Sequence, residues 1–533
     1  MATIPGVYVN TSVRTGPPTV TAPAGAALFA VGEATHGPIN EAKTVGSMAE
    51  FVAEYGNRYG DGYLYDTIQT FFEEGGQQAH ILRVWKGSGG GTDVGTSELA
   101  TSVTNTALHL DAKNVGAWGN SLTVLHNTVN RKITLSGTPD GIDEVFSYAA
   151  GGSDVANLRD IINHTVTGSK WVTARIALAD SQSGTVDNTA TLNAISAAQS
   201  FSDATAADTM DATTIADAWG VDVDDPSHGQ YFTASLGSGM VASPGWGPTG
   251  TTFTDDGTTR SSVWVNMIKH CVANNRIACL TFGDDEMSVD NTVTYRDAFV
   301  TGIAGVSGLP DDTYGLEYAA MYHPHVKIPN GSGSTRSIDP SGYVAAARAR
   351  AHAAAGAWRA GAGAISAGRF VLEPTLTLTA AQLEDLAEAQ INPIRSVAGS
   401  LRVYGARSAS TDDVNWTFIT FRDLLNYVSI EVENVIEPFV FSVIDSRGQI
   451  FAKIEGALVG MLEAVRQDGG LYERRAANGN LVDRGYTVVA GNSINTAATL
   501  NQGLIKAEVG VRVSPVGERV QISITKSALT SGL

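Results

Sequence analysis

The chain has 533 residues, and 43% of them are apolar, which is enough for roughly two to four domains with buried cores. Its formal net charge of −19, from 54 acidic and 35 basic residues, argues against general binding to nucleic acid or anionic membranes. The cysteines are Cys271 and Cys279 alone, which excludes a disulfide framework and favours a reduced, cytosolic place of assembly. We expect neither a signal peptide nor a membrane-spanning helix, because no basic-then-apolar start and no apolar run of about 18 residues occurs.

The first residues predict a short strand. Ile4, Val7 and Val9 are apolar, and Pro5 lies near the start, which is typical of a strand at the edge of a sheet. Residues 11–25 are rich in turn formers and offer no second strand to pair with it. From the pattern alone, this strand pairs either with the chain's own sheet or with the sheet of a neighbouring subunit. We treat residues 1–24 as an N-terminal arm and linker.

Residues 25–86 predict the first part of an α/β layer. An apolar run at 25–33 suits a buried strand, a short helix starts at Ser47, and a strand covers 80–85. Between them, residues 61–76 predict a helix that ends at a pair of glycines. The apolar stripe of that helix consists of Leu64, Ile68, Phe71 and Phe72.

Residues 87–260 predict an inserted outer domain that is mainly β. The segment follows a glycine-rich hinge at 86–95 and contains short alternating strands. Between Arg175 and Arg260 it has no lysine or arginine but has eleven aspartates, as a solvent-facing, peripheral region would.

Residues 261–374 return to helix–strand alternation and predict the second part of the α/β layer. A helix and a strand cover 265–282, another strand leads into a loop at 318–329, and a helix starts after Asp339 as a candidate N-cap.

Residues 375–533 predict an α+β C-terminal domain. Thr379 caps a first helix, a strand lies at 401–406, and two longer helices follow. The chain closes with two alternating strands, which form a C-terminal arm. Their apolar residues in phase are Val509, Val511, Val513, Val520, Ile522 and Ile524. The fold class is therefore α/β plus α+β, multidomain, with a strand-bearing arm at each end.

Signals for chemistry are weak. His323 and His325 lie on one side of a strand, but no cysteine or acidic cluster at ligand spacing accompanies them, so a metal is the weaker reading. The acidic turn 283–286 could hold a cation or an active site, although a solvated turn is favoured. The glycines at 360–368 lack the lysine of a phosphate-binding loop. We predict no cofactor, no metal and no enzymatic activity; an α/β hydrolase using His323, His325 and Asp284 is the alternative.

Several segments, in this order, resemble contractile tail sheath proteins. They are IPGVYVN, ALFAVGEATHGPIN, SMAEFVAEYG, YDTIQTFFEEGGQQAHILRVW, GAWGN at 116–120, the stretch from Tyr322 to Trp358, and INPIRSVAGSLRVYGARSASTDDVNWTFITFRDLLNYVSIEVE. The last is similar to the signature of the sheath C-terminal domain. In this chain the signature residues are Asn392, Gly405, Ala406, Arg407, Trp416 and Arg422.

The resemblance implies a bacteriophage tail sheath subunit. Such subunits stack as hexameric rings around an inner tube, exchange strands through both arms, and contract to drive the tube through the host envelope without nucleotide hydrolysis. The implied partners are other copies, the tube, the baseplate and the tail terminator, with no nucleic acid and no membrane insertion. The implied location is the virion tail, assembled in the host cytoplasm. A tailocin or type VI-like injection system is the first alternative.

Two sets of side chains are candidates for contacts in such an assembly. Arg407, Trp416 and Arg422 are either interface groups or structural ones, with the arginines paired to acids such as Glu431. Glu463 and Arg466, on the polar side of a helix at 456–467, are candidates for contact with the tube, since the resemblance implies that a C-terminal-domain helix faces it.

Overall fold

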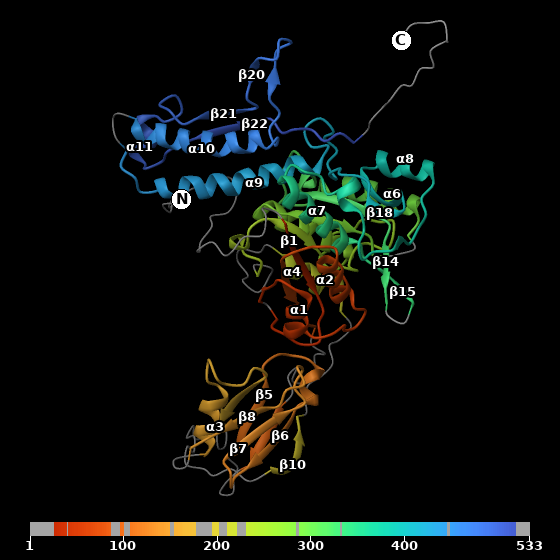
Figure 1. The fold of residues 1–533 in the computed structure, drawn as a ribbon, viewed down its shortest axis with the longest axis vertical. Helices are drawn as coiled ribbons and strands as arrows, with labels where there is room; N and C mark the ends of the chain where they lie inside the picture. Colours follow the sequence, from red (N-terminus) through yellow and green to blue (C-terminus); the bar gives the residue numbers. More distant parts are fainter. Residues whose placement is uncertain are drawn as a thin grey trace.

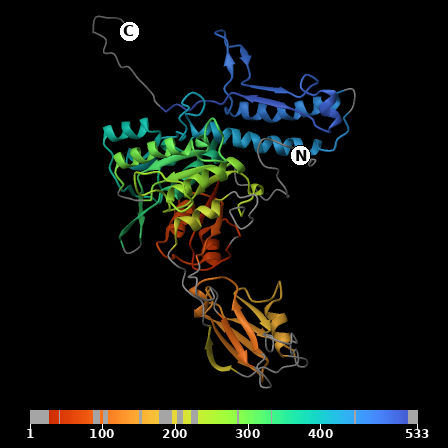
Figure 2. The same cartoon turned by 180° about the vertical axis from the view of Figure 1, so that it is seen from behind.

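The computed structural model describes the chain in three parts that follow one another along its long axis (Figures 1 and 2). A small β domain lies at one end, an α/β layer in the middle, and a helical hairpin with a small sheet at the other end. No helix among the described residues is both long and apolar enough to cross a bilayer. The described residues are 26–39, 41–86, 96–100, 107–149, 154–176, 195–201, 210–220, 231–283, 287–330, 333–444 and 448–518.

The middle part is built on an eight-stranded sheet with the order β18-β17-β13-β12-β11-β1-β3-β2. Its central strands are parallel, and only the two edge strands, β2 and β18, run antiparallel to their neighbours. The strands are β1 (Ala27–Gly32), β2 (Lys43–Val45), β3 (Ala79–Arg83), β11 (Gly239–Ala242), β12 (Ile277–Thr281), β13 (Ala319–His323), β17 (Ile391–Val397) and β18 (Ser400–Val403).

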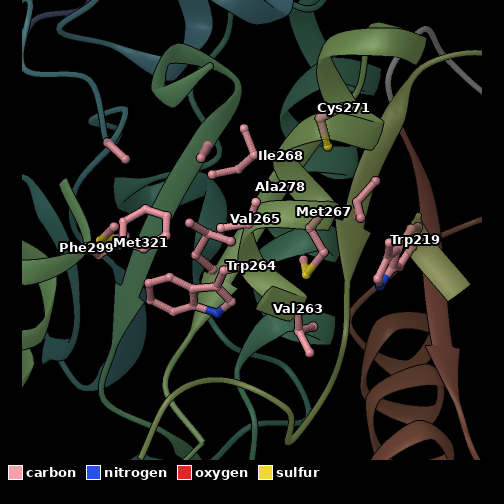
Figure 3. Packing of buried hydrophobic residues seen from close by; sticks show 14 of the residues in the cluster. Trp219, Val263, Trp264, Val265, Met267, Ile268, Cys271, Ala278, Phe299 and Met321 are labelled. Atoms are coloured by element: carbon pink, nitrogen blue, oxygen red, sulfur yellow. The ribbon is translucent and has the colours of Figure 1, made fainter. Parts of the chain in front are cut away.

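Helices cover both faces of this sheet. One face packs under α4 (Ala212–Trp219), α5 (Arg260–Asn274), α6 (Val289–Ile303) and α8 (Ala380–Glu388). The other face packs under α1 (Met48–Tyr55), α2 (Tyr63–Glu73) and α7 (Ser341–Ala355). Figure 3 shows the first face, where the Trp264 ring meets the edge of Phe299 with centroids 5.3 Å apart.

The outer domain has its own core between two small sheets and one helix. The sheets have the orders β10-β6-β7-β8 and β4-β5-β9. Their elements are β4 (Thr96–Ala100), β5 (Ala107–Ala112), β6 (Thr123–Asn127), β7 (Lys132–Ser136), β8 (Glu144–Ser147), α3 (Asp154–Ile162), β9 (Val172–Ile176) and β10 (Ile195–Ser200).

The inserted domain is shorter than the sequence indicated. The sequence analysis assigned 87–260 to it, but β11 lies between β1 and β12 of the large sheet, and α4 packs on that sheet. β11 has only four residues, all buried, so it shows no alternation that would mark a strand.

The C-terminal part is a hairpin of two long helices, α9 (Ile419–Ile436) and α10 (Gln449–Gln467), with a small sheet against it (Figure 1). Its boundary also differs from the expected 375–533, because β17 and β18 belong to the large sheet. The other elements of this part are β19 (Arg474–Arg475), β20 (Leu481–Asp483), β21 (Tyr486–Val489), α11 (Ala497–Asn501) and β22 (Glu508–Val511).

A separate three-stranded sheet has the order β15-β14-β16. Its strands are β14 (Val326–Pro329), β15 (Thr335–Ile338) and β16 (Glu373–Pro374).

Candidate assembly site

The place where parallel α/β sheets usually bind ligands is filled in this chain. The strand order reverses between β1 and β11, and such a switch point commonly opens a crevice. Here the crevice holds a cavity of only about 10 Å³, room for one water molecule, between Glu33, Tyr63 and Trp246. A Cβ on Gly245 would lie 2.5 Å from the Tyr63 ring, which shows how closely the walls meet.

The two histidines considered as metal ligands are buried packing residues. His323 is 2% exposed and His325 is 7% exposed, and His325 Nε2 lies 2.6 Å from the carbonyl oxygen of Phe282. Burial, reinforced by the neighbouring His325, lowers the pKa of His323 to about 3. Within the described ranges, no three His, Cys, Asp or Glu side chains gather as metal ligands would. Asp284 lies outside those ranges.

Three of the signature residues form one corner. The side-chain amide of Asn392 accepts a hydrogen bond from Arg407 N at 2.7 Å and donates to Arg407 O at 2.8 Å and to Met321 O at 3.0 Å. Gly405 passes so close that a Cβ there would lie 2.6 Å from Asn392 Oδ1. This corner joins β17 to β13 and fixes the backbone of Arg407.

Two further signature residues, Trp416 and Arg422, contact each other. The Arg422 guanidinium lies 4.2 Å from the centroid of the Tyr318 ring and 5.4 Å from that of Trp416. Its Nε also donates to Asn426 Oδ1 at 3.0 Å. Aromatic rings and an amide contact Arg422 directly, and the nearby acids that act on its charge are Glu317 and Asp423 rather than the expected Glu431. These contacts favour a structural role for Trp416 and Arg422.

A buried charge cluster ties the C-terminal helices to the α/β layer. Arg348 on α7 pairs with Asp423 on α9 through two bonds, one of them Nε to Oδ2 at 3.1 Å, and His352 Nε2 lies 3.6 Å from the same carboxylate. The side chains of Arg348 and Asp423 are 7% and 2% exposed. Burial alone would raise the pKa of Asp423, but Arg348 and His352 outweigh it and lower the pKa to about 2. Sequence analysis missed this cluster.

The first closing strand pairs within the chain. β22 runs antiparallel to β21, with Val509 opposite Val488 and Val511 opposite Tyr486. These four side chains pack toward α9 and α10. Val513, just past the end of β22, forms a bridge with Leu471. The expected strand therefore exists, but its first partner is the chain's own β21.

The opposite side of β21 is open. Arg512 N donates to Gly485 O at 2.7 Å, and in an antiparallel pair this bond fixes which residues face the partner. By that alternation, the backbone groups of Tyr486 and Val488 point away from β22. Among the described residues, no strand pairs with that side of β21. An exposed edge of this kind is a template for another strand.

The two candidates for tube contact bind each other. Arg466 donates to Glu463, with Nε to Oε2 at 3.0 Å, and also pairs with Glu473, while Tyr486 donates to Glu463 Oε2 at 2.9 Å. The hydrogen bond from Arg466 lowers the pKa of Glu463 to about 2. Both side chains thus connect α10 to the small sheet, and their contact with a tube stays a prediction. The remaining arm residues lie outside the described residues: Ile4, Val7, Val9, Val520, Ile522 and Ile524.

Comparison with known proteins gives a result at the level of structure only. No protein-family model and no curated protein matches the sequence. A sheath tail protein from Listeria innocua superposes with a TM-score of 0.55 at 12% identity, covering 89% of this chain and 90% of that one. The contracted PVC sheath complex of an extracellular contractile injection system gives 0.52 at 14% identity, covering 99% and 98%. The contracted baseplate of the anti-feeding prophage gives 0.56 at 16% identity, covering 98% and 99%. Over nearly its whole length, the chain has the fold of contractile sheath proteins.

Proposed function

We propose that the chain is a structural, non-enzymatic subunit of a contractile sheath, which polymerises around an inner tube and shortens to drive it forward. The observation that carries the proposal is the match to sheath structures over almost the full length of both chains. The filled crevice between β1 and β11 supports it, since the usual ligand site of such a sheet is taken up by the chain's own side chains.

Strand addition is the contact we propose between subunits. The open side of β21 is the acceptor, and the alternating segment with Ile4, Val7 and Val9 is a suitable donor. A short added strand makes about four backbone hydrogen bonds worth about 1 kcal/mol each, and burying three Val or Ile side chains adds about 1.5–3 kcal/mol each. Each contact is thus worth about 8–13 kcal/mol before ordering costs, enough to persist while subunits move.

The finer assignment we propose is a bacteriophage tail, with the tube, baseplate and tail terminator as further partners and the virion as location. The long outer domain supports a phage tail over a tailocin or type VI-like system. The genes next to this one would decide, because capsid genes accompany a phage tail and are absent from the other systems.

Deleting residues 1–12 tests the strand-addition step. We expect a monomer with the circular dichroism spectrum and unfolding curve of the full chain, because residues from Ala26 onward already form extensive cores on both faces of the large sheet. Electron micrographs of the deleted protein should lack the hollow striated cylinders that the full chain forms. Cylinders of normal yield from the deleted protein would rule out this arm as the donor.

A further inference from the structure

Contacts with Asn392 and Ala387 hold Arg407 in place independently of its acidic partner. Its backbone is fixed on both sides by the amide of Asn392, as described above. Its Nη1 donates to Ala387 O at 2.9 Å, in the last turn of α8, where a cation is favoured. The planar guanidinium therefore presents its Nε and Nη2 edge in a fixed direction.

A glutamate from the far end of the chain occupies that edge. Glu518 lies 111 residues after Arg407, and its carboxylate accepts bonds from Nε at 3.1 and 3.2 Å and from Nη2 at 2.8 Å. The two side chains are 20% and 26% exposed. A bidentate arginine–carboxylate pair of this kind is stronger and more directional than a single surface contact.

The pair lies where the chain has left its own C-terminal sheet. Ser514 N still bonds to Gly470 O at 3.0 Å, beside β22. Past that point the chain runs back toward the α/β layer (Figure 1), and Glu518 is the last described residue. The Arg407–Glu518 pair therefore sets the position of the chain just before residues 519–533.

The surroundings favour an anionic side chain at this place. A cavity of about 180 Å³ adjoins the pair, too small for a drug-sized ligand but large enough for a side chain. Arg395 lines the same cavity, with its guanidinium 4.2 Å from the centroid of the Tyr404 ring. In the part of the chain that the structure describes, Arg395 Nε has no hydrogen-bond partner. Two arginines thus face a cavity that contains one carboxylate.

We propose that the Arg407–Glu518 pair is a positioning clamp for assembly: it fixes the point from which the chain continues to a second copy. The inference rests on the proposed function, because the second copy is a neighbouring sheath subunit. Releasing the clamp moves the last fixed point back to Ser514, so the segment samples a larger volume. Its effective concentration at the neighbour then falls. Arg407 does not itself contact the neighbouring subunit in this proposal. It acts by fixing the start of residues 519–533, which make the contact.

The test is the Glu518→Gln variant, which keeps the shape of the side chain and removes its charge. Glu508→Gln, on the exposed face of β22, is the matched control. In the monomer at low salt, we expect a nitroxide label on Gly517→Cys, where a new Cβ meets no atom within 4 Å, to become several-fold more mobile in Glu518→Gln only. We expect the critical concentration for cylinder formation to rise by a similar factor.

Each other outcome contradicts a specific claim. If the label is as mobile in wild type as in Glu518→Gln, the pair does not hold the segment and the clamp is wrong. If the mobility rises while the critical concentration stays at the wild-type value, the clamp has no part in assembly and the inference is wrong. If the wild-type chain forms no cylinders at any concentration, the proposed function itself fails, and the control arm identifies that case.

Discussion

The large sheet and the small C-terminal sheet differ in how completely the chain covers them. Helices bury both faces of the eight-stranded sheet, and its β18 edge is taken by other parts of the same chain. There, Val403 N donates to Ser366 Oγ at 3.1 Å, and Gly368 N donates to Leu401 O at 2.9 Å. The β21–β22 sheet has one face on the helical hairpin, and its β21 edge is open. The β18 edge of the large sheet is thus covered within one chain, whereas the β21 edge of the small sheet has backbone groups left for a partner.

Ion pairs also differ between the two regions in how deeply they are buried. Between the α/β layer and the C-terminal helices, the Arg348–Asp423 pair is buried and has fixed geometry. Around the small sheet, ion pairs such as Arg512–Asp483 are half exposed, with side chains 50% and 29% accessible. Buried pairs are costly to break from one side, whereas exposed pairs contribute little to stability. We therefore expect α9 to move with the α/β layer as one body.

The largest expected effect on stability comes from breaking that buried pair. Asp423→Ala leaves Arg348 and His352 buried without their carboxylate, so we expect a loss of about 3–5 kcal/mol in the free energy of unfolding. Urea denaturation of the monomer measures it. Asp413→Ala, on an exposed loop next to α9, is the control and should change stability by less than about 0.5 kcal/mol. Equal effects from the two variants would contradict the buried-pair account.

The pH dependence of the same pair has a definite sign. Because the folded pKa of Asp423 is depressed to about 2, its contribution is complete above the ordinary aspartate pKa and is lost as pH falls toward 2. The acid unfolding curve of Asp423→Asn should therefore be flatter than that of wild type between about pH 4 and pH 2. Parallel curves would show that Asp423 is not held ionised.

Two glycine substitutions test the same difference between the α/β layer and the C-terminal part, with smaller expected changes in the free energy of unfolding. Gly405→Ala places a Cβ 2.6 Å from Asn392 Oδ1 in the tightly bonded corner, so we expect a loss of about 1–3 kcal/mol. Gly460→Ala, on α10 with no atom within 4 Å of the new Cβ, should gain about 0.5–1 kcal/mol. Thermal unfolding of both variants gives the comparison, and a gain at residue 405 would contradict the packing described for that corner.

One substitution separates assembly from monomer stability. Val488→Pro removes an N–H that faces the open side of β21, so we expect loss of cylinders in electron micrographs. The bonds to β22 are kept but part of the Val488 packing on α9 and α10 is lost, so the free energy of unfolding should fall by about 1–2 kcal/mol and the monomer should stay folded. Val488→Thr keeps the N–H and should still assemble. Cylinders formed by Val488→Pro at the wild-type critical concentration would show that β21 is not the acceptor.

The sequence predicted the elements with strong local signals. Ser47 accepts from Glu50 N as an N-cap, and Thr379 forms a full capping box with Gln382, as their positions indicated. Within the apolar run at 25–33, Ala27–Gly32 form β1 and are buried at every position. Local chemistry decides these features, so a single sequence contains the information.

What the sequence left out depends on residues that meet only in space. Arg348 and Asp423 are separated by 75 residues, and Arg350 and Glu74 by 276, so no spacing marks either buried pair. β11 was missed because four buried residues show no periodicity. The strand at 506–514 was predicted, but its partner was not, because β21 is a half-buried strand with no strong pattern of its own.

The central claim is that another subunit completes the small sheet. Cryo-electron microscopy of the assembled full-length protein, at a resolution that separates strands, tests it most directly. We predict density for a strand from another subunit along the open side of β21, hydrogen-bonded to Tyr486 and Val488. A chain that stays monomeric at high concentration, or an assembly in which that side of β21 has no added strand, would contradict the account.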